Sequence, residues 1–321
     1  MTAAGVTPRV GADTALLLEG YIFRIVTAER ALTLNDGRIL TYLDLGDPSG
    51  SPVVYFHGAP SGKLETEFFG LGERARRAGV RLIVADRPGV GGSTGVASRT
   101  LLDGGHDAVA IADALGFERF ALLGYSVGAA FALAARHVGG RRVTATALVS
   151  GIGPADAPGI TDGRSADVTR IFAMALKAPR ITSAMLRFMR FGTRTPERMI
   201  AATGKSMPPA DRAVADRPGA AEPFAAFLAD ALRSGTSGVL QDLQLAARPW
   251  GFVPEDAAGP VVLWHGEADA NAPIASAQWL RSRLPRAEAH LTSDDGHISL
   301  FDREASAVLD RLVELDRRER D

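Results

Sequence analysis

The chain has 321 residues, of which 46% are hydrophobic and 23% are charged, so it can bury a sizeable core as ordinary globular proteins do. Its 36 Lys and Arg against 37 Asp and Glu give a net charge of −1, which argues against a nucleic-acid surface or a surface for anionic membranes. The absence of Cys excludes disulfides, thiolate catalysis and thiolate metal sites.

The first half of the chain predicts strands that alternate with helices, although residues 1–30 give no clear element. Two short strands, 31–34 and 38–45, flank Asn35-Asp36-Gly37, a hairpin turn signal. Buried strands are predicted at 52–56, 80–85, 120–123 and 143–149, with helices between them at 65–78, 107–115 and 129–136. Such alternation predicts an α/β fold with a mostly parallel sheet, helices on both faces, and ligands at the carboxyl ends of the strands.

Residues 151–250 interrupt this pattern. They contain no clear strand and several helix-like pieces rich in Phe and Met. The sheet resumes at 260–264 and 287–292, and a final helix is predicted at 302–315. We therefore expect a core made of residues 1–150 and 251–321, with residues 151–250 as a helical cap over the strand ends. Most of the following apolar residues of this segment are expected to pack between helices, and a few to line an acyl pocket: Phe172, Met174, Met185, Leu186, Phe188, Met189, Phe224, Phe227 and Leu228.

A candidate nucleophile lies in Gly124-Tyr125-Ser126-Val127-Gly128, which matches the pattern G-x-S-x-G. The motif stands between a buried strand and a helix of small residues, where a strained turn would lift the Ser126 hydroxyl clear of the backbone. The two glycines are expected because strand and helix approach too closely for a Cβ at either position. The alternative is an ordinary turn in which Ser126 caps the helix.

A serine hydroxyl needs a base, and in this context the expected chain order is Ser, acid, His. Asp269 follows the strand at 260–264, and His297 follows the next strand, so both lie on strand-end loops with Ser126. Glu267 and Asp156 are the alternatives to Asp269. The remaining histidines are expected to serve in packing, at the surface or in hydrogen bonds to loop backbone: His57, His106, His137, His265 and His290.

Acyl transfer also requires donors for the developing oxyanion. We expect them to be the backbone N–H of Val127, at the start of the helix after Ser126, and that of Ala59, just past a strand end. A plain turn is the alternative for His57-Gly58-Ala59-Pro60.

These motifs together resemble the α/β-hydrolase fold family over about residues 31–320. The matching pieces are His57-Gly58-Ala59-Pro60, Asp86-Arg87-Pro88-Gly89-Val90-Gly91-Gly92-Ser93, Gly124-Tyr125-Ser126-Val127-Gly128, Gly266-Glu267-Ala268-Asp269 and Gly296-His297. The piece from Asp86 to Ser93 is similar to the family's D-x-x-G-x-G-x-S turn, which has a structural role there. The resemblance implies a capped serine esterase or related hydrolase.

At several motif positions the chain differs from known subfamilies of this fold, and these differences narrow the activities that the resemblance implies. Haloalkane dehalogenases and epoxide hydrolases of this fold carry Asp where Ser126 stands. Proline-iminopeptidase-like members carry H-G-G-P-G, whereas this chain has Ala59 and Ser61 at two of the glycine positions, and the H-G-G-G signature of hormone-sensitive-lipase-like esterases is absent.

The preferred function is hydrolysis of a small, uncharged, moderately hydrophobic carboxylic ester through an acyl-enzyme, with no cofactor and no metal. One alternative keeps the fold but changes the bond to an amide or peptide, a carbon–carbon bond or the peroxidation of an acid. An aminopeptidase would need a cap carboxylate, for which Glu197, Asp211 and Glu222 are candidates. Another alternative is a ligand receptor with a vestigial triad.

The expected partner is a small-molecule substrate rather than a nucleic acid, and the oligomeric state stays open. Residues 1–9 lack the features of a signal peptide, and no apolar run is long enough to span a bilayer. We therefore expect a cytoplasmic protein without a membrane span.

Overall fold

The computed structural model describes residues 17–18, 21–22, 29–204 and 207–320. At its centre is an eight-stranded sheet with the order β10-β9-β8-β7-β5-β6-β4-β3. Its strands are β3 (Arg30–Thr33), β4 (Ile39–Gly46), β5 (Ser51–Phe56), β6 (Val80–Ala85), β7 (Phe120–Tyr125), β8 (Val143–Val149), β9 (Val261–Gly266) and β10 (Ala287–Thr292). Strands β5 to β10 run parallel, and β4 joins β6 and β3 antiparallel. The predicted α/β class and mostly parallel sheet are confirmed.

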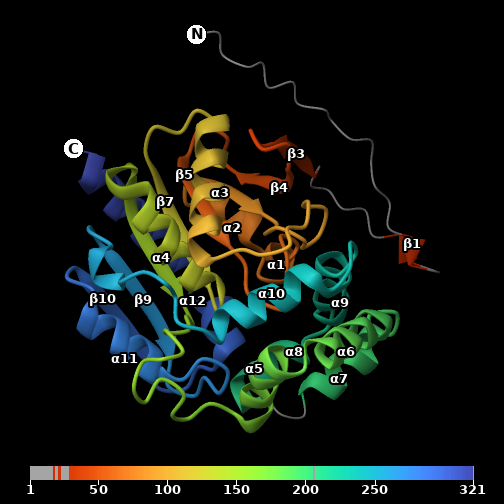
Figure 1. Cartoon of the computed structure of the whole chain (residues 1–321). Helices are drawn as coiled ribbons and strands as arrows, with labels where there is room; N and C mark the ends of the chain where they lie inside the picture. Colours follow the sequence, from red (N-terminus) through yellow and green to blue (C-terminus); the bar gives the residue numbers. More distant parts are fainter. Residues whose placement is uncertain (1–16, 19–20, 23–28, 205–206, 321) are drawn as a thin grey trace.

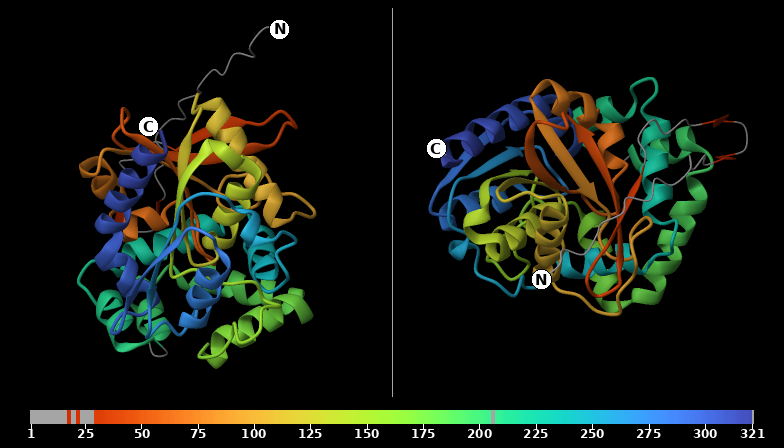
Figure 2. Two further views of the ribbon diagram at one scale, coloured as in Figure 1. Left: turned by 90° about the vertical axis from the view of Figure 1, so that its left-hand side faces the viewer. Right: turned by 90° about the horizontal axis from the view of Figure 1, so that it is seen from above.

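Helices cover both faces of this sheet (Figures 1 and 2). One face is covered by α2 (Leu71–Arg77) and α12 (His297–Arg320), and the other by α3 (Leu101–Ala114), α4 (Gly128–Gly139) and α11 (Ile274–Arg283). Side chains alternate along each strand, so Val53 and Tyr55 of β5 join the first core while Val54 and Phe56 join the second. The two cores fix the register of the central strands and hold their carboxyl ends at one edge.

Two predicted helices differ in their bounds because of local signals. The expected helix 65–78 is two helices, α1 (Glu65–Phe68) and α2, since Gly70 between them has a φ of 59° that interrupts the helical path. Helix α3 begins at Leu101 rather than at residue 107, because Thr100 and Asp103 form a capping box there.

The final helix also begins earlier than predicted, at His297 instead of residue 302. The reason is a contact with a distant segment of the chain. The carboxylate of Asp211, far away in the sequence, accepts hydrogen bonds from the backbone N–H groups of His297, Ile298 and Ser299 at 2.8–2.9 Å. These groups are the unpaired donors of a helix N-terminus, so the helix is capped by a residue that local sequence does not supply.

We call residues 151–260, which connect β8 to β9, the insertion. Its described residues form no strand but contain α5 (Ala166–Lys177), α6 (Pro179–Gly192), α7 (Pro196–Thr203), α8 (Pro209–Ala215), α9 (Ala221–Ala231) and α10 (Ser237–Ala246). Figure 1 shows these helices gathered to one side of the sheet.

The N-terminal segment left unassigned by the sequence contains one described pair, β1 (Leu17–Leu18) with β2 (Tyr21–Ile22), which is antiparallel. Residues 1–16, 19–20 and 23–28 lie outside the described residues. Within the part of the chain that the structure describes, no helix combines the length and apolar character required to cross a bilayer.

Candidate functional site

Ser126 occupies the turn between β7 and α4 with a φ of 56°, a conformation that is uncommon for a residue with a side chain. Its backbone N–H donates to Val149 O at 3.0 Å, which ties the turn to the neighbouring strand. A Cβ on Gly124 would lie 2.7 Å from Gly128 O, and one on Gly128 would lie 2.0 Å from Phe56 O. The turn therefore requires both glycines, as the motif predicts.

His297 lies within hydrogen-bonding distance of this serine. Its Nε2 is 2.9 Å from Ser126 Oγ, although 171 residues separate the two in the sequence. The ring belongs to the first residue of α12, whose carbonyl oxygen accepts hydrogen bonds from Ser150 Oγ at 3.1 Å and from Tyr125 Oη at 3.3 Å. Both donors lie at the ends of neighbouring strands, so the sheet holds the backbone of His297 in place.

Asp269 completes this chain of hydrogen bonds. Its Oδ2 is 2.8 Å from His297 Nδ1, and its Oδ1 accepts from the backbone N–H groups of Asn271 and Ala272, both at 2.8 Å. An ionised carboxylate only accepts hydrogen bonds, so Nδ1 carries the proton and Nε2 is left with a lone pair toward Ser126. This arrangement can move a proton from the hydroxyl to the imidazole.

The charges around the imidazole set its basicity. Burial by itself would lower the pKa of His297, but the Asp269 carboxylate and its hydrogen bond, with smaller contributions from Asp211 and Glu65, raise that pKa above the ordinary 6.5. Burial would likewise raise the pKa of Asp269, yet His297 and the hydrogen bonds lower it. The pair therefore favours an imidazolium beside a carboxylate, which is the charge distribution reached after proton transfer.

Two backbone amides of residues beside the serine have no protein acceptor among the described residues. In the described part of the chain, neither the N–H of Val127 nor that of Ala59 donates to another protein atom. Both residues line the same cavity as Ser126. Amides in such a position can stabilise negative charge that develops on a substrate oxygen.

The peptide that carries the Ala59 amide is held by Arg87. Its guanidinium donates to His57 O at 2.6 Å and to Gly58 O at 2.7 Å, and it pairs with the buried carboxylate of Asp242 in α10 at 2.9–3.0 Å. Because a peptide unit is planar, fixing the Gly58 carbonyl also fixes the direction of the Ala59 N–H. The insertion, through Asp242, thus helps to hold this amide.

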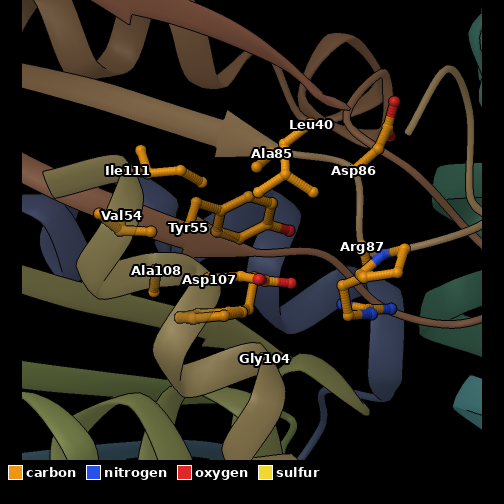
Figure 3. Close-up of a pocket in the computed structure, with 12 residues that line it drawn as sticks. Leu40, Val54, Tyr55, Ala85, Asp86, Arg87, Gly104, Asp107, Ala108 and Ile111 are labelled. Atoms are coloured by element: carbon orange, nitrogen blue, oxygen red, sulfur yellow. The ribbon is translucent and has the colours of Figure 1, made fainter. Parts of the chain in front are cut away.

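Figure 3 shows Arg87 next to Asp86 at the end of β6, with the two side chains on opposite sides of the chain. A small cavity of about 20 Å³ lies beside them, between β5, β6 and α3. The Asp86 carboxylate turns away from the site and pairs with Lys63 Nζ at 2.6 Å. Lys63 also pairs with Asp230 of α9 at 2.7 Å. Asp86 and Arg87 therefore belong to two separate links between the core and the insertion.

A cavity of about 350 Å³ opens beside Ser126 and His297, between the strand ends and the insertion. Its walls are mostly apolar. The insertion contributes Ile171, Phe172, Met189, Met199, Met207, Phe224, Phe227, Leu228 and Leu243 to it. Of the apolar residues singled out from the sequence, Leu186 is buried, whereas Phe188 is 76% exposed and so differs from the packing role expected for it.

The alternative acids do not contact His297, and the other histidines are not hydrogen-bonded to Ser126, although His265 Nε2 lies 3.7 Å from the Asp269 carboxylate. Glu267 and Asp156 are exposed, and neither pairs with His297. Two buried histidines bond loop backbone as expected: His57 Nδ1 is 2.8 Å from Gly58 O, and His265 Nε2 is 2.6 Å from Ala272 O. Burial lowers the pKa of His57 to about 3, with the Arg87 charge acting in the same direction, so this ring is neutral.

Among the carboxylates proposed to bind a substrate ammonium, only Asp211 lines the cavity, while Glu197 and Glu222 do not. Both Asp211 oxygens already accept hydrogen bonds from the start of α12. Sequence reasoning did not identify Glu65, which also lines the cavity. Burial raises its pKa, against hydrogen bonds from Tyr55 Oη and from the Gly58 N–H at 3.1 Å. The only local signal was a carboxylate at the start of a helix close to a strand end.

The described residues contain no cluster of three or more His, Asp or Glu side chains arranged to hold a metal ion. The groups at the site are instead a hydroxyl, an imidazole, carboxyl groups and backbone amides.

Comparisons with known proteins agree with this architecture. An esterase from Rhodococcus sp. ECU1013 superimposes with a TM-score of 0.64 at 18% identity, over 90% of this chain and 98% of that one. A putative aryl esterase from Burkholderia cenocepacia gives 0.63 at 20% identity, over 91% and 98% of the two chains. A bromoperoxidase from Bacillus anthracis gives 0.64 at 17% identity, over 91% and 100%. Identities this low show a shared fold.

At the level of sequence, no curated protein matches the chain. The pattern that defines the alpha/beta hydrolase fold family, however, matches residues 51–304, which is most of the chain and includes the segments around Ser126, Asp269 and His297. The chain belongs to the alpha/beta hydrolase fold family.

Proposed function

We propose that the protein is a serine hydrolase that cleaves a small, uncharged, moderately hydrophobic carboxylic ester through an acyl-enzyme intermediate. The observation that carries this proposal is the continuous hydrogen-bonded series Ser126–His297–Asp269, with separations of 2.9 and 2.8 Å, beside a mostly apolar cavity. The esterases among the structural neighbours agree with the proposal, although their low identity carries no information on substrate.

In the proposed mechanism, His297 Nε2 takes the proton of Ser126 Oγ as this oxygen attacks the ester carbonyl carbon. The N–H groups of Val127 and Ala59 stabilise the oxyanion of the tetrahedral intermediate. When the intermediate collapses, the imidazolium gives its proton to the leaving alcohol. Water activated by His297 then attacks the acyl-enzyme and releases the acid, which restores Ser126. Asp269 keeps the ring in the productive tautomer and stabilises its positive charge.

We also propose that residues 151–250 act as a cap that determines which acyl group fits. The insertion supplies most of the apolar cavity wall, including Phe172, Phe224 and Phe227. Because this part of the wall is apolar and the described residues that line the cavity include no Lys or Arg, the cavity favours uncharged esters over anionic ones.

The aminopeptidase alternative receives less support. It requires a free carboxylate to hold the substrate ammonium, but the oxygens of Asp211 are occupied by the N-terminus of α12. The other insertion carboxylate in the cavity wall, Asp167, already pairs with Arg170 at 3.2 Å. The Glu65 carboxyl has a raised pKa and already bonds Tyr55. Cofactor-free peroxidation of an acid would use the same groups as ester cleavage, and a comparison of ester and peroxide substrates separates the two reactions.

The test uses a fluorophosphonate probe together with p-nitrophenyl esters of increasing acyl length. We expect Ser126→Ala to lose probe labelling and to lower ester turnover by about 10⁴-fold or more. Ser282→Ala is the control, because this exposed serine in α11 donates its hydroxyl to Trp279 O of its own helix and does not line the cavity. Unchanged turnover in Ser126→Ala would refute the proposed nucleophile. Tight binding of a small molecule by a wild type without turnover would favour a receptor.

A further inference from the structure

Helix α6 in the insertion exposes large apolar side chains to solvent. Ile181, Phe188 and Phe191 are 61%, 76% and 61% exposed, which makes them the three most exposed large hydrophobic residues in the described part of the chain. Their spacing of seven and three residues places them on one side of the helix. Figure 1 shows α6 on the side of the insertion that faces away from the sheet.

These residues are not needed to pack the helix against the protein. The opposite side of α6 carries Thr182 and Leu186, which are fully buried, and Met189, which lines the cavity. Helix α6 therefore has two apolar sides, and among the described residues only one of these sides is packed against a partner. An exposed apolar ridge on a well-packed helix indicates a surface that meets something else.

The surroundings of the ridge are strongly basic. Residues 171–196 contain five cationic side chains and no Asp or Glu: Lys177, Arg180, Arg187, Arg190 and Arg194. All five are exposed, and none forms an ion pair with a described residue. The overall net charge of −1 conceals this local excess, because the acidic residues that balance it lie outside the segment.

The cations lie beside the apolar ridge. Successive residues of an α-helix turn by about 100°, so the α6 arginines fall between its buried side and the ridge. Arg187, Arg190 and Arg194 line a shallow hollow next to Phe191, where α6 adjoins α9. The Arg194 guanidinium stacks over the Phe191 ring, 4.8 Å from its centre.

We propose that α6 and its arginines form a docking surface for an anionic phospholipid bilayer. The apolar ridge enters the boundary between headgroups and acyl chains, and the arginines pair with lipid phosphates. A second copy of the chain fits less well, because a two-fold symmetric contact through this surface would bring its arginines against each other without acidic partners. This inference does not depend on the chemistry proposed for Ser126.

The experiment is sedimentation of the full chain with vesicles of phosphatidylcholine alone or mixed with phosphatidylglycerol. We expect binding to the mixed vesicles, weak binding to the neutral ones, and a decrease with salt. Phe188→Ser with Phe191→Ser should weaken binding by at least about tenfold, since two large apolar side chains no longer enter the bilayer. Arg187→Gln, Arg190→Gln and Arg194→Gln together should weaken it by on the order of tenfold or more at low salt.

Matched controls change the same chemistry elsewhere on the surface. Val253→Ser with Leu291→Ser removes exposed apolar groups outside α6, and Arg141→Gln, Arg248→Gln and Arg281→Gln remove three exposed cations. Both controls should bind vesicles as the wild type does, and all variants should keep turnover of a soluble ester. The proposal is overturned if the wild type ignores anionic vesicles or if the α6 and control variants bind equally. A dimer that the Phe188 and Phe191 changes convert to a monomer would also overturn it, because the surface would then join protein copies.

Discussion

The imidazole of His297 experiences two opposing influences, burial and a neighbouring carboxylate, and the carboxylate prevails. Only the neutral ring can take the proton of Ser126, so kcat/KM for an uncharged ester should fall as the pH drops through a pKa above 6.5. Asp269→Asn removes the charge that raises this pKa. We expect its acid limb to move to lower pH and its kcat to fall by about 10⁴-fold.

The measurement is the pH dependence of kcat/KM in wild type, in Asp269→Asn and in His106→Gln. The last is a control on an exposed histidine of α3 and should reproduce the wild-type profile. An acid limb at the same pH in wild type and Asp269→Asn would contradict the role proposed for the carboxylate.

Arg87 provides a second prediction at the scale of single residues. It donates to two successive carbonyls of the loop that carries the Ala59 amide, and the single ammonium of lysine does not reproduce that planar fork. Arg87→Lys should therefore lower kcat by about 10- to 100-fold with a smaller change in KM, since the oxyanion donor loses its alignment. The affinity for a boronic acid, which mimics the tetrahedral intermediate, should fall in parallel.

Arg99→Lys is the matched control for this change. Arg99 also pairs with the buried Asp242, but its other partners are Gly238 O and Gln241, so it does not touch the His57–Gly58 loop. Both variants should lose stability through the shared carboxylate, and only Arg87→Lys should lose kcat and boronate affinity. Equal loss of kcat in the two variants would indicate a purely structural role for Arg87.

At the scale of elements, the strand–turn–helix unit around Ser126 depends on close backbone contacts. A Cβ at position 128 would meet Phe56 O at 2.0 Å and His57 O at 2.7 Å, both backbone atoms that cannot move without shifting β5. We expect Gly128→Ala to destabilise the protein by about 1–3 kcal/mol or more and to remove most of the activity. Urea unfolding and ester turnover measure the two effects.

Gly72→Ala is the corresponding control in α2, where a Cβ would have no neighbour closer than 4.0 Å. Alanine favours a helix over glycine by about 1 kcal/mol, so this variant should equal or exceed the wild type in stability. Similar losses of stability and activity in both variants would show that the lack of space for a Cβ at position 128 does not explain the effect of Gly128→Ala.

At the scale of the whole molecule, the insertion is joined to the core by buried charges. Lys63 Nζ lies 2.6 Å from the Asp86 carboxylate after β6 and 2.7 Å from the Asp230 carboxylate in α9. All three side chains are almost fully buried. Lys63→Met would leave the Asp86 carboxylate without its cation and Asp230 with only the Arg233 guanidinium, 3.1 Å away, and we expect it to cost about 3–5 kcal/mol of unfolding free energy.

A partly exposed ion pair between insertion and core offers the comparison. Arg217 of the insertion pairs with Asp302 of α12 at 2.7 Å, with the Arg217 side chain half exposed. Arg217→Gln should change the stability by at most about 1 kcal/mol, because water screens the pair. Urea unfolding measures the loss of stability in Lys63→Met and in Arg217→Gln. Equal losses would mean that burial does not determine how strongly these ion pairs join the insertion to the core.

Much of the architecture follows from the sequence alone because its signals are local. Apolar runs predict strands β6 and β8 with the bounds that the structure has, since a buried strand must present apolar groups to both cores. The predicted bounds of the partly exposed edge strand β10 also match. The loops that carry Ser126, Asp269 and His297 were located for the same reason. Each follows a predicted parallel strand, and the carboxyl ends of such strands meet at one edge.

Other features were decided only by tertiary contacts between distant segments. Asp211 caps α12 from another helix, Arg87 reaches the His57–Gly58 loop, and Glu65 is brought into the cavity wall. The period of a helix reveals which residues share a side, but the neighbours decide which side is covered. Phe188 and Leu186 are both apolar residues of α6, yet one lies in water and the other in the core. The sequence by itself therefore determined the fold and the groups that meet at the strand ends, while packing between remote segments decided how those groups are held and which surface is left exposed.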